Sequence, residues 1–183
     1  MLGPKMEKAL NEQIAREVYS AFLYMSMSAD CTFKGLKGFA NWFMVQYHEE
    51  MFHAIKIYEY VLRQNGSIKL ATIDAPPYTF KSPLEVFTLS LAHEQKVTAW
   101  INDIAALAVK EKDFDTQTFI QWYVTEQIEE EKDVNDVLVQ LNLIKADIPG
   151  LSLLDRDLGT RMLAVPSDFS KGVEAAMKAM GNA

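Results

Sequence analysis

The amino-acid sequence predicts an all-α fold: a four-helix bundle with one long crossover connection and a short fifth helix. Apolar residues recur at alternating spacings of four and three along four long segments, which is typical of helices that face a shared core. A glycine-marked turn separates the first two segments, a short turn near Lys112-Asp113 separates the last two, and residues 66–82 between the second and third show no periodicity. Each segment also carries acidic or other ligand-type side chains among its apolar positions.

The first helix is predicted to begin at Pro4, because proline suits a first helical position. It ends before the turn at residues 34–38, which contains two glycines. Its core-facing positions include one acid, Glu17, one heptad before Tyr24. These positions are Leu10, Ile14, Glu17, Ala21, Tyr24 and Ser28.

The second helix is predicted from about Leu36 to Gln64, ended by the Asn-Gly pair that follows. Glu50 and His53 occupy core-facing positions in its middle. Because they lie three residues apart, both point to the same side of the helix and can hold one cation. An unpaired charge is costly to bury there, so the pair requires a neutralising partner.

Residues 66–82 are predicted to cross the full length of the bundle. The second helix should be about 43 Å long at 1.5 Å per residue, and 17 extended residues reach roughly 55 Å. A loop this long without structure of its own normally marks a special connection. The crossover therefore places the third helix beside the second.

The third helix begins with a capping box at Ser82-Pro83-Leu84-Glu85, carries Glu94 among its core positions, and ends near Lys112. The fourth carries Gln127 and Glu130. Residues 147–150, Asp-Ile-Pro-Gly, are interpreted as a break, and a short fifth helix follows, up to Pro166, with apolar positions at Leu151, Leu154, Leu158 and Met162. Residues 1–166 are thus predicted to form one bundle domain, and residues 167–183 a mobile C-terminal tail.

The ligand-type residues are expected to meet in the middle of the bundle, since their distances from the helix ends agree. Glu17, Glu50, Glu94 and Glu130 carry four negative charges, which two divalent cations balance. Oxygen-rich ligands with one imidazole suit iron or manganese better than zinc. The sequence therefore predicts a dinuclear metal centre. Tyr24 either hydrogen-bonds a ligand or bound oxygen species there or simply packs in the core.

Several motifs together resemble the non-haem bacterial ferritins, within the ferritin-like di-iron carboxylate family. The resemblance extends over roughly residues 1–165. The motifs are Asn11-Glu12-Gln13, Tyr19 to Tyr24, Glu49 to His53, His93-Glu94-Gln95, Gln121 to Val124 and Glu126 to Lys132.

The resemblance implies a ferritin-like bundle and a cytoplasmic iron-storage ferroxidase. Such a protein oxidises Fe(II) with oxygen or hydrogen peroxide at a di-iron centre within each subunit, and stores ferric mineral in a 24-subunit shell. Glu17, Glu50 and His53 would hold one iron, with Glu50 bridging to a second iron. The second iron would be held by Glu94 and Glu130, with Gln127 beside them.

The resemblance also implies a third, weaker iron site, formed by Glu49, Glu126 and Glu129 together with Glu130. Glu126 and Glu129 lie three residues apart and share a flank of the fourth helix. The alternative is a hydrated acidic patch. Haem is not expected, although Met51 matches the position of the haem-binding methionine of bacterioferritins. The fourth helix has Gln127-x-x-Glu130, where bacterioferritins repeat Glu-x-x-His.

Charge, apolar runs and cysteine count argue against several classes of function. The net charge of −7 argues against nucleic acid and against an anionic membrane surface. No apolar run reaches the roughly 18 residues of a membrane span, and no signal peptide is apparent. Two alternatives stay open, a rubrerythrin-like di-iron peroxidase and a DNA-protecting mini-ferritin. The single cysteine and the missing second Glu-x-x-His argue against the first, and the complete ligand set within one chain argues against the second.

Four further residues are expected to have supporting or structural roles. His48 and His93 are expected at the surface or in support of the ligands. Asp113 and Asp115, near the start of the fourth helix, are either helix N-terminal residues or the lining of an iron entry pore, and the first interpretation is preferred.

Overall fold

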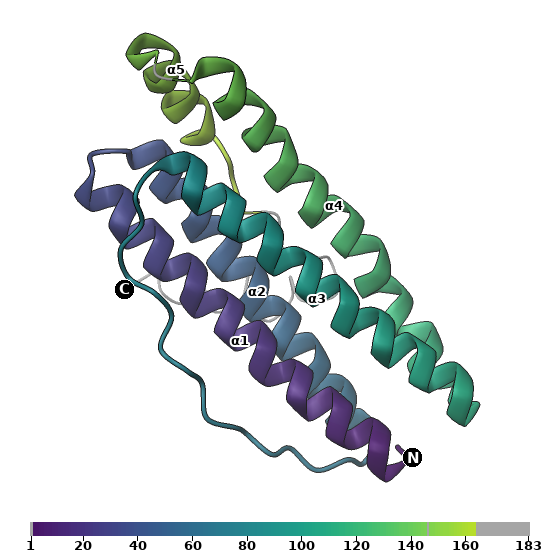
Figure 1. Cartoon of the computed structure of the whole chain (residues 1–183). Helices are drawn as coiled ribbons and strands as arrows, with labels where there is room; N and C mark the ends of the chain where they lie inside the picture. Colours follow the sequence, from purple (N-terminus) through teal and green to yellow (C-terminus); the bar gives the residue numbers. More distant parts are fainter. Residues whose placement is uncertain (1, 146, 164–183) are drawn as a thin grey trace, which may run out of the picture.

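A computed structural model describes residues 2–145 and 147–163, and in that range it contains five helices (Figure 1). They are α1 (Pro4–Phe33), α2 (Lys37–Arg63), α3 (Pro83–Glu111), α4 (Phe114–Ile144) and α5 (Ile148–Leu158). The predicted all-α bundle with a fifth helix is therefore confirmed. The predicted tail, residues 167–183, and the predicted domain boundary at residue 166 lie outside the described residues.

Short turns make α1 antiparallel to α2 and α3 antiparallel to α4, and these two pairs form the bundle. Gly35 has a φ of +79° in the first turn, a conformation that glycine adopts without strain. Lys112 has a φ of 57° in the second. Asp113 caps α4 by accepting a hydrogen bond from the Thr116 backbone N–H at 3.0 Å. The capping role preferred for Asp113 is thus present in the structure.

The predicted crossover is also present. The chain leaves α2, runs along the outside of α1 for the length of the bundle, and enters α3 at the far end (Figure 1). Side chains of α1 hold it in place. Asn11 donates to the Ser67 carbonyl at 2.9 Å and accepts from the Lys69 N–H at 2.6 Å, while Ser26 donates to the Pro77 carbonyl at 2.6 Å. The crossover therefore has fixed contacts along its path.

Apolar side chains fill the bundle in two clusters, one toward each end. The first cluster lies near α5 and contains Tyr24, Phe39, Phe43, Phe87 and Leu141, among others. The second lies near the N-terminus and contains Leu10, Ile57, Ile101, Ile120 and Tyr123, among others. The buried carboxylates lie along the helices between the two clusters, in the middle of the bundle.

The fifth helix begins earlier and ends earlier than predicted, at Ile148 and Leu158, whereas it was expected to begin at Leu151 and to run up to Pro166. The segment Asp-Ile-Pro-Gly does follow the end of α4, but its last three residues belong to α5. Asp147 is the N-cap and accepts a hydrogen bond from the Gly150 N–H at 3.0 Å, and proline is tolerated in the first helical turn.

Helix α5 packs on the start of α2, where one acid of α5 holds two backbone groups of α2. The Asp155 carboxylate accepts from the backbone N–H groups of Gly38 and Phe39, at 2.8 and 3.0 Å. A Cβ atom at Gly38 would lie 1.5 Å from the Asp155 carbonyl oxygen, so only glycine allows this approach. Among the described residues, no helix is both long enough and apolar enough to cross a membrane.

Candidate metal centre

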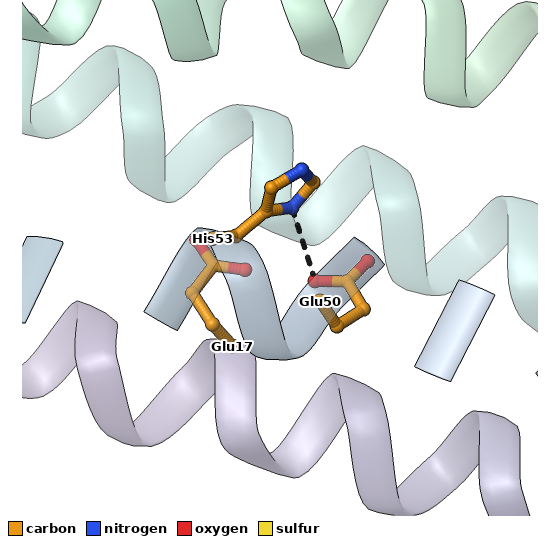
Figure 2. Close-up of side chains that lie close together, drawn as sticks. All are labelled: Glu17, Glu50 and His53. Carbon is orange, nitrogen blue, oxygen red and sulfur yellow. Dashed lines mark ion pairs between the residues drawn. The ribbon is translucent and has the colours of Figure 1, made fainter. Parts of the chain in front are cut away.

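Glu17 of α1 and Glu50 and His53 of α2 face one another in the middle of the bundle (Figure 2). Each offers one ligand atom, and these three atoms lie within 4.8 Å of one another. His53 Nδ1 is 3.4 Å from Glu50 Oε2. All three side chains are buried, with relative exposures of 1% for each glutamate and 3% for the histidine. The spacing of three residues on α2 brings the last two together, as expected for a helix.

Glu94 of α3 and Glu130 of α4 complete the buried set from the opposite pair of helices. The Tyr24 hydroxyl donates to Glu94 Oε1, and Gln127 Nε2 donates to Glu94 Oε2 at 3.2 Å. Gln46 Nε2 donates to Glu130 Oε2 at 2.7 Å. Each of these two carboxylates is thereby oriented by at least one neutral side chain.

Two carboxylate oxygens in this set accept no hydrogen bond among the described residues. Glu17 Oε1 accepts from Gln13 Nε2 at 2.8 Å, but Glu17 Oε2 is buried without a hydrogen bond. Glu50 Oε2 is likewise buried without a hydrogen bond, and its contact with His53 Nδ1 at 3.4 Å is an ion-pair contact. A buried acceptor without a donor is costly and rare in native proteins. Because both oxygens belong to acids that face one another, a cation bound between them would satisfy both. The donor set, mainly carboxylates with one imidazole, fits iron.

The pKa values show how strongly these acids depend on a counter-charge. Burial, together with the charge of Glu17, raises the pKa of Glu94 to about 7, although the hydrogen bonds from Tyr24 and Gln127 lower it in part. Burial raises the pKa of Glu130 to about 8, with Glu94 adding to the effect. Burial also raises the pKa of Glu50 well above its ordinary value, where Glu94 and Glu17 again contribute. These mutual effects indicate that all four acids belong to one charge cluster.

Both nitrogen atoms of the His53 ring lie near carboxylates, Nδ1 near Glu50 and Nε2 near Glu126. Burial lowers the pKa of His53, but the nearby carboxylates of Glu126 and Glu50 and the charge of Glu17 outweigh burial and hold the pKa well above its usual range. The Tyr123 hydroxyl donates to the His53 backbone carbonyl at 2.8 Å, and the rings of Trp122 and Tyr123 pack edge-on against the imidazole. These contacts fix the position of the ring.

A second group of possible ligands lies on the outer side of His53. His53 Nε2 is 3.9 Å from Glu126 Oε1, and His53, Glu126 and Glu130 offer ligand atoms within 4.8 Å of one another. These residues line a pocket of about 250 Å³, together with Glu49 and Glu129. The acids suggested for a third site therefore share one pocket, but Glu49 and Glu129 are not among the three groups that lie within that distance.

Glu49 and Glu129 differ in their surroundings. Glu129 is exposed to solvent. Glu49 is largely buried and forms an ion pair with Arg161, whose Nη2 atom lies 2.8 Å from Glu49 Oε2. Burial raises the pKa of Glu49, while the Arg161 charge lowers it.

Three supporting residues were not predicted. Gln46 lies four residues before Glu50 on the same side of α2, so a polar residue at that core-facing position could have indicated its role. Gln13 lies four residues before Glu17, which is the spacing for a contact along one helix face. Arg161 carries no such signal, because its partner Glu49 is 112 residues away.

The two remaining histidines have different surroundings. His48 is exposed. His93 is buried, and its Nε2 atom lies 2.8 Å from the Ser20 hydroxyl. Burial and nearby Lys96 lower the pKa of His93 to about 4, so its ring is neutral.

Comparisons with known proteins agree with this architecture. The model of the ferritin family, the ferritin-like domain, matches residues 7–144. A "probable bacterial non-heme ferritin-like protein" of Haemophilus influenzae is 41% identical over 160 residues, covering 87% of this chain and 96% of that protein. A "bacterial non-heme ferritin" of Staphylococcus aureus is 37% identical over 161 residues, covering 88% and 97%.

Two solved structures are similar over almost the whole bundle. The open-pore ferritin of the archaeon Archaeoglobus fulgidus matches with a TM-score of 0.88 and 43% identity, covering 88% of this chain and 100% of that one. A form of the Archaeoglobus ferritin engineered to be closed also gives a TM-score of 0.88 at 43% identity, covering 90% and 100%.

Proposed function

Because this chain belongs to the ferritin family, we propose that it oxidises Fe(II) at the buried carboxylate cluster and stores the ferric product as mineral. The observation that carries the proposal is the pair of buried oxygens that accept no hydrogen bond, Glu17 Oε2 and Glu50 Oε2, inside a cluster of four buried acids. A structural core has no use for such a cluster, since removing the charges would stabilise it. A cation-binding centre requires it.

In this proposal Fe(II) is the substrate, and the side chains divide the work of holding two ions. Glu17, Glu50 and His53 bind one, Glu94 and Glu130 bind the other, and Glu50 bridges them. Two Fe(II) ions supply two electrons, enough to reduce oxygen to hydrogen peroxide or hydrogen peroxide to water. Gln13, Gln46 and Gln127 donate hydrogen bonds to three of the acids and hold their remaining oxygens in place.

Tyr24 and Gln127 are proposed as positioning residues for Glu94. Both donate to its carboxylate, so both favour the ionised form that binds a cation.

Stopped-flow measurement of Fe(II) oxidation tests the buried centre and distinguishes its role from that of the pocket lined by Glu49 and Glu126. Glu50→Ala and Glu94→Ala should each remove the fast oxidation phase, because each takes away a direct ligand. Glu49→Ala and Glu126→Ala should keep that phase and change the ratio of iron oxidised to oxygen consumed, because they act at the proposed third site. Glu59→Ala, an exposed acid farther along α2, is the matched control. Equal loss of the fast phase in all four variants would contradict the division into two sites.

Storage further requires a closed shell, which we propose to contain 24 copies. With 20.8 kDa per chain its mass would be about 0.5 MDa, and such closure needs repeated, complementary interfaces. Native mass spectrometry or light scattering at low iron measures this directly. Monomers or dimers alone would refute storage while leaving the oxidation proposal intact.

A further inference from the structure

The pocket on the outer side of His53, lined by several glutamates, is called the outer acidic pocket. After α5 the chain turns back and places one positively charged side chain, Arg161, against it. Arg161 and Met162 line this pocket together with Glu49, His53 and Glu126. The Arg161–Glu49 pair is well shielded, with side-chain exposures of 20% and 15%. A charge-assisted hydrogen bond of 2.8 Å in such a place is stronger than a pair on the open surface.

Several contacts fix Arg161 in this position. Its guanidinium lies over the Trp42 ring, 4.6 Å from the ring centroid, and its Nη1 atom is 3.4 Å from the Trp42 carbonyl oxygen. The Asn41 side-chain amide donates to the Arg161 carbonyl at 3.0 Å and to the Leu158 carbonyl at 3.3 Å. The start of α2 therefore holds both the backbone and the side chain of Arg161.

The pair engages the same carboxylate that a cation in the pocket would need. Glu126 lies on the His53 side of the pocket, while Glu49 already forms an ion pair with Arg161 of the same chain. A cation that uses Glu49 must displace the guanidinium or share the carboxylate with it, and either step weakens binding. Glu50, only one residue away, has no arginine or lysine partner among the described residues, and its Oε2 atom is buried without a hydrogen bond.

We propose that Arg161 is an internal competitor for the outer cation site. It neutralises Glu49 while the site is empty and keeps the affinity of the outer site below that of the inner pair. Arg161 would thereby set the order in which the sites fill. The inference rests on the proposed function, because it assumes that the outer acids bind the same divalent substrate.

Calorimetric titration with Zn(II), a redox-inert divalent cation, measures the three sites without oxidation. In the unmodified protein two cations should bind tightly and a third more weakly. Arg161→Gln should strengthen binding of the third by about tenfold, the order expected from freeing one partly buried, charge-paired carboxylate. Arg161→Lys keeps the charge and should stay close to the unmodified protein. Arg156→Gln, on the exposed side of α5, is the matched control and should have no effect.

A double variant tests whether the effect passes through Glu49. In a Glu49→Gln background, Arg161→Gln should no longer strengthen the third site. An equal strengthening there would overturn the competition for Glu49. Unchanged or weaker third binding in Arg161→Gln, or the same strengthening in Arg161→Lys, would overturn the inference as well. Failure of the first two cations to bind in the unmodified protein would instead refute the proposed function.

Discussion

Cation binding to the buried cluster should release protons in a pH-dependent amount. Glu94 and Glu130 have pKa values of about 7 and about 8 in the cation-free protein, so both are protonated at pH 6. A bound cation requires both to be ionised. Loading at pH 6 should therefore release one proton from each. At pH 9 both are already ionised, and the number of protons released should be lower by about two.

Titration calorimetry in buffers of different ionisation enthalpy counts these protons directly. Zn(II), or Fe(II) without oxygen, serves as the cation, and the slope of the apparent enthalpy against buffer enthalpy gives the number released. Glu94→Gln removes one of the two titrating groups and should lower the count at pH 6 by about one. The reasoning is refuted if two cations bind at pH 6 with the same proton release as at pH 9.

The same shifts fix the sign of the stability change of the cation-free protein. Both acids have folded pKa values above the unfolded value near 4.5, so the folded state binds more protons between about pH 4.5 and 8. Their contribution to stability is present below this window and is lost as the pH rises through it. For Glu94 alone the loss is about 3 kcal/mol, since each pKa unit corresponds to about 1.4 kcal/mol. Cations replace the protons, so the rise in Tm on loading should be larger at pH 8 than at pH 5.

Three further changes give separate tests. Glu130→Gln removes a buried carboxylate that is ionised at pH 9, so the Tm of the cation-free protein should rise at pH 9 and change little at pH 5; a lower Tm at pH 9 would argue against it. Gly38→Ala places a Cβ atom 1.5 Å from the Asp155 carbonyl oxygen and should lower the free energy of unfolding by about 2–4 kcal/mol in urea denaturation, whereas a change under 0.5 kcal/mol would show that α5 moves at no cost. Tyr24→Phe removes a hydrogen bond that lowers the pKa of Glu94, so Zn(II) binding should weaken more at pH 6 than at pH 9, and equal weakening at both would contradict this role.

The periodic part of the structure followed from the sequence because each residue's neighbours there are local. A core position repeats every three or four residues, so the middle of each helix was predictable, including the burial of Glu17, Glu50, Glu94 and Glu130. The length of residues 66–82 was enough to predict the crossover. The start of the fifth helix was predicted wrongly. Asp147-Ile148-Pro149-Gly150 was interpreted as a break, although an aspartate N-cap followed by a proline in the first turn also starts helices.

What the sequence did not predict depends on contacts between distant segments. Arg161 reaches Glu49 only because Gly38 lets α5 approach α2, and no spacing along the chain encodes that approach. His93 could not be placed either, since its partner Ser20 lies on another helix, 73 residues away. The acids of the outer acidic pocket were predicted, but Arg161, the positively charged residue among them, was not.

The division of the apolar core into two clusters has a consequence for how the bundle opens. Each end has its own nucleus of large side chains, with Phe43 and Phe87 in one and Ile57 and Ile101 in the other. Between them the cation-free protein has a layer of buried acids, so we expect the two ends to exchange their amide hydrogens as separate cooperative units. Cations bound as proposed would join all four helices across this layer and merge the two units into one. Amide protection on the two sides of the layer should then become equal, so that backbone amides far from any ligand would report the loading.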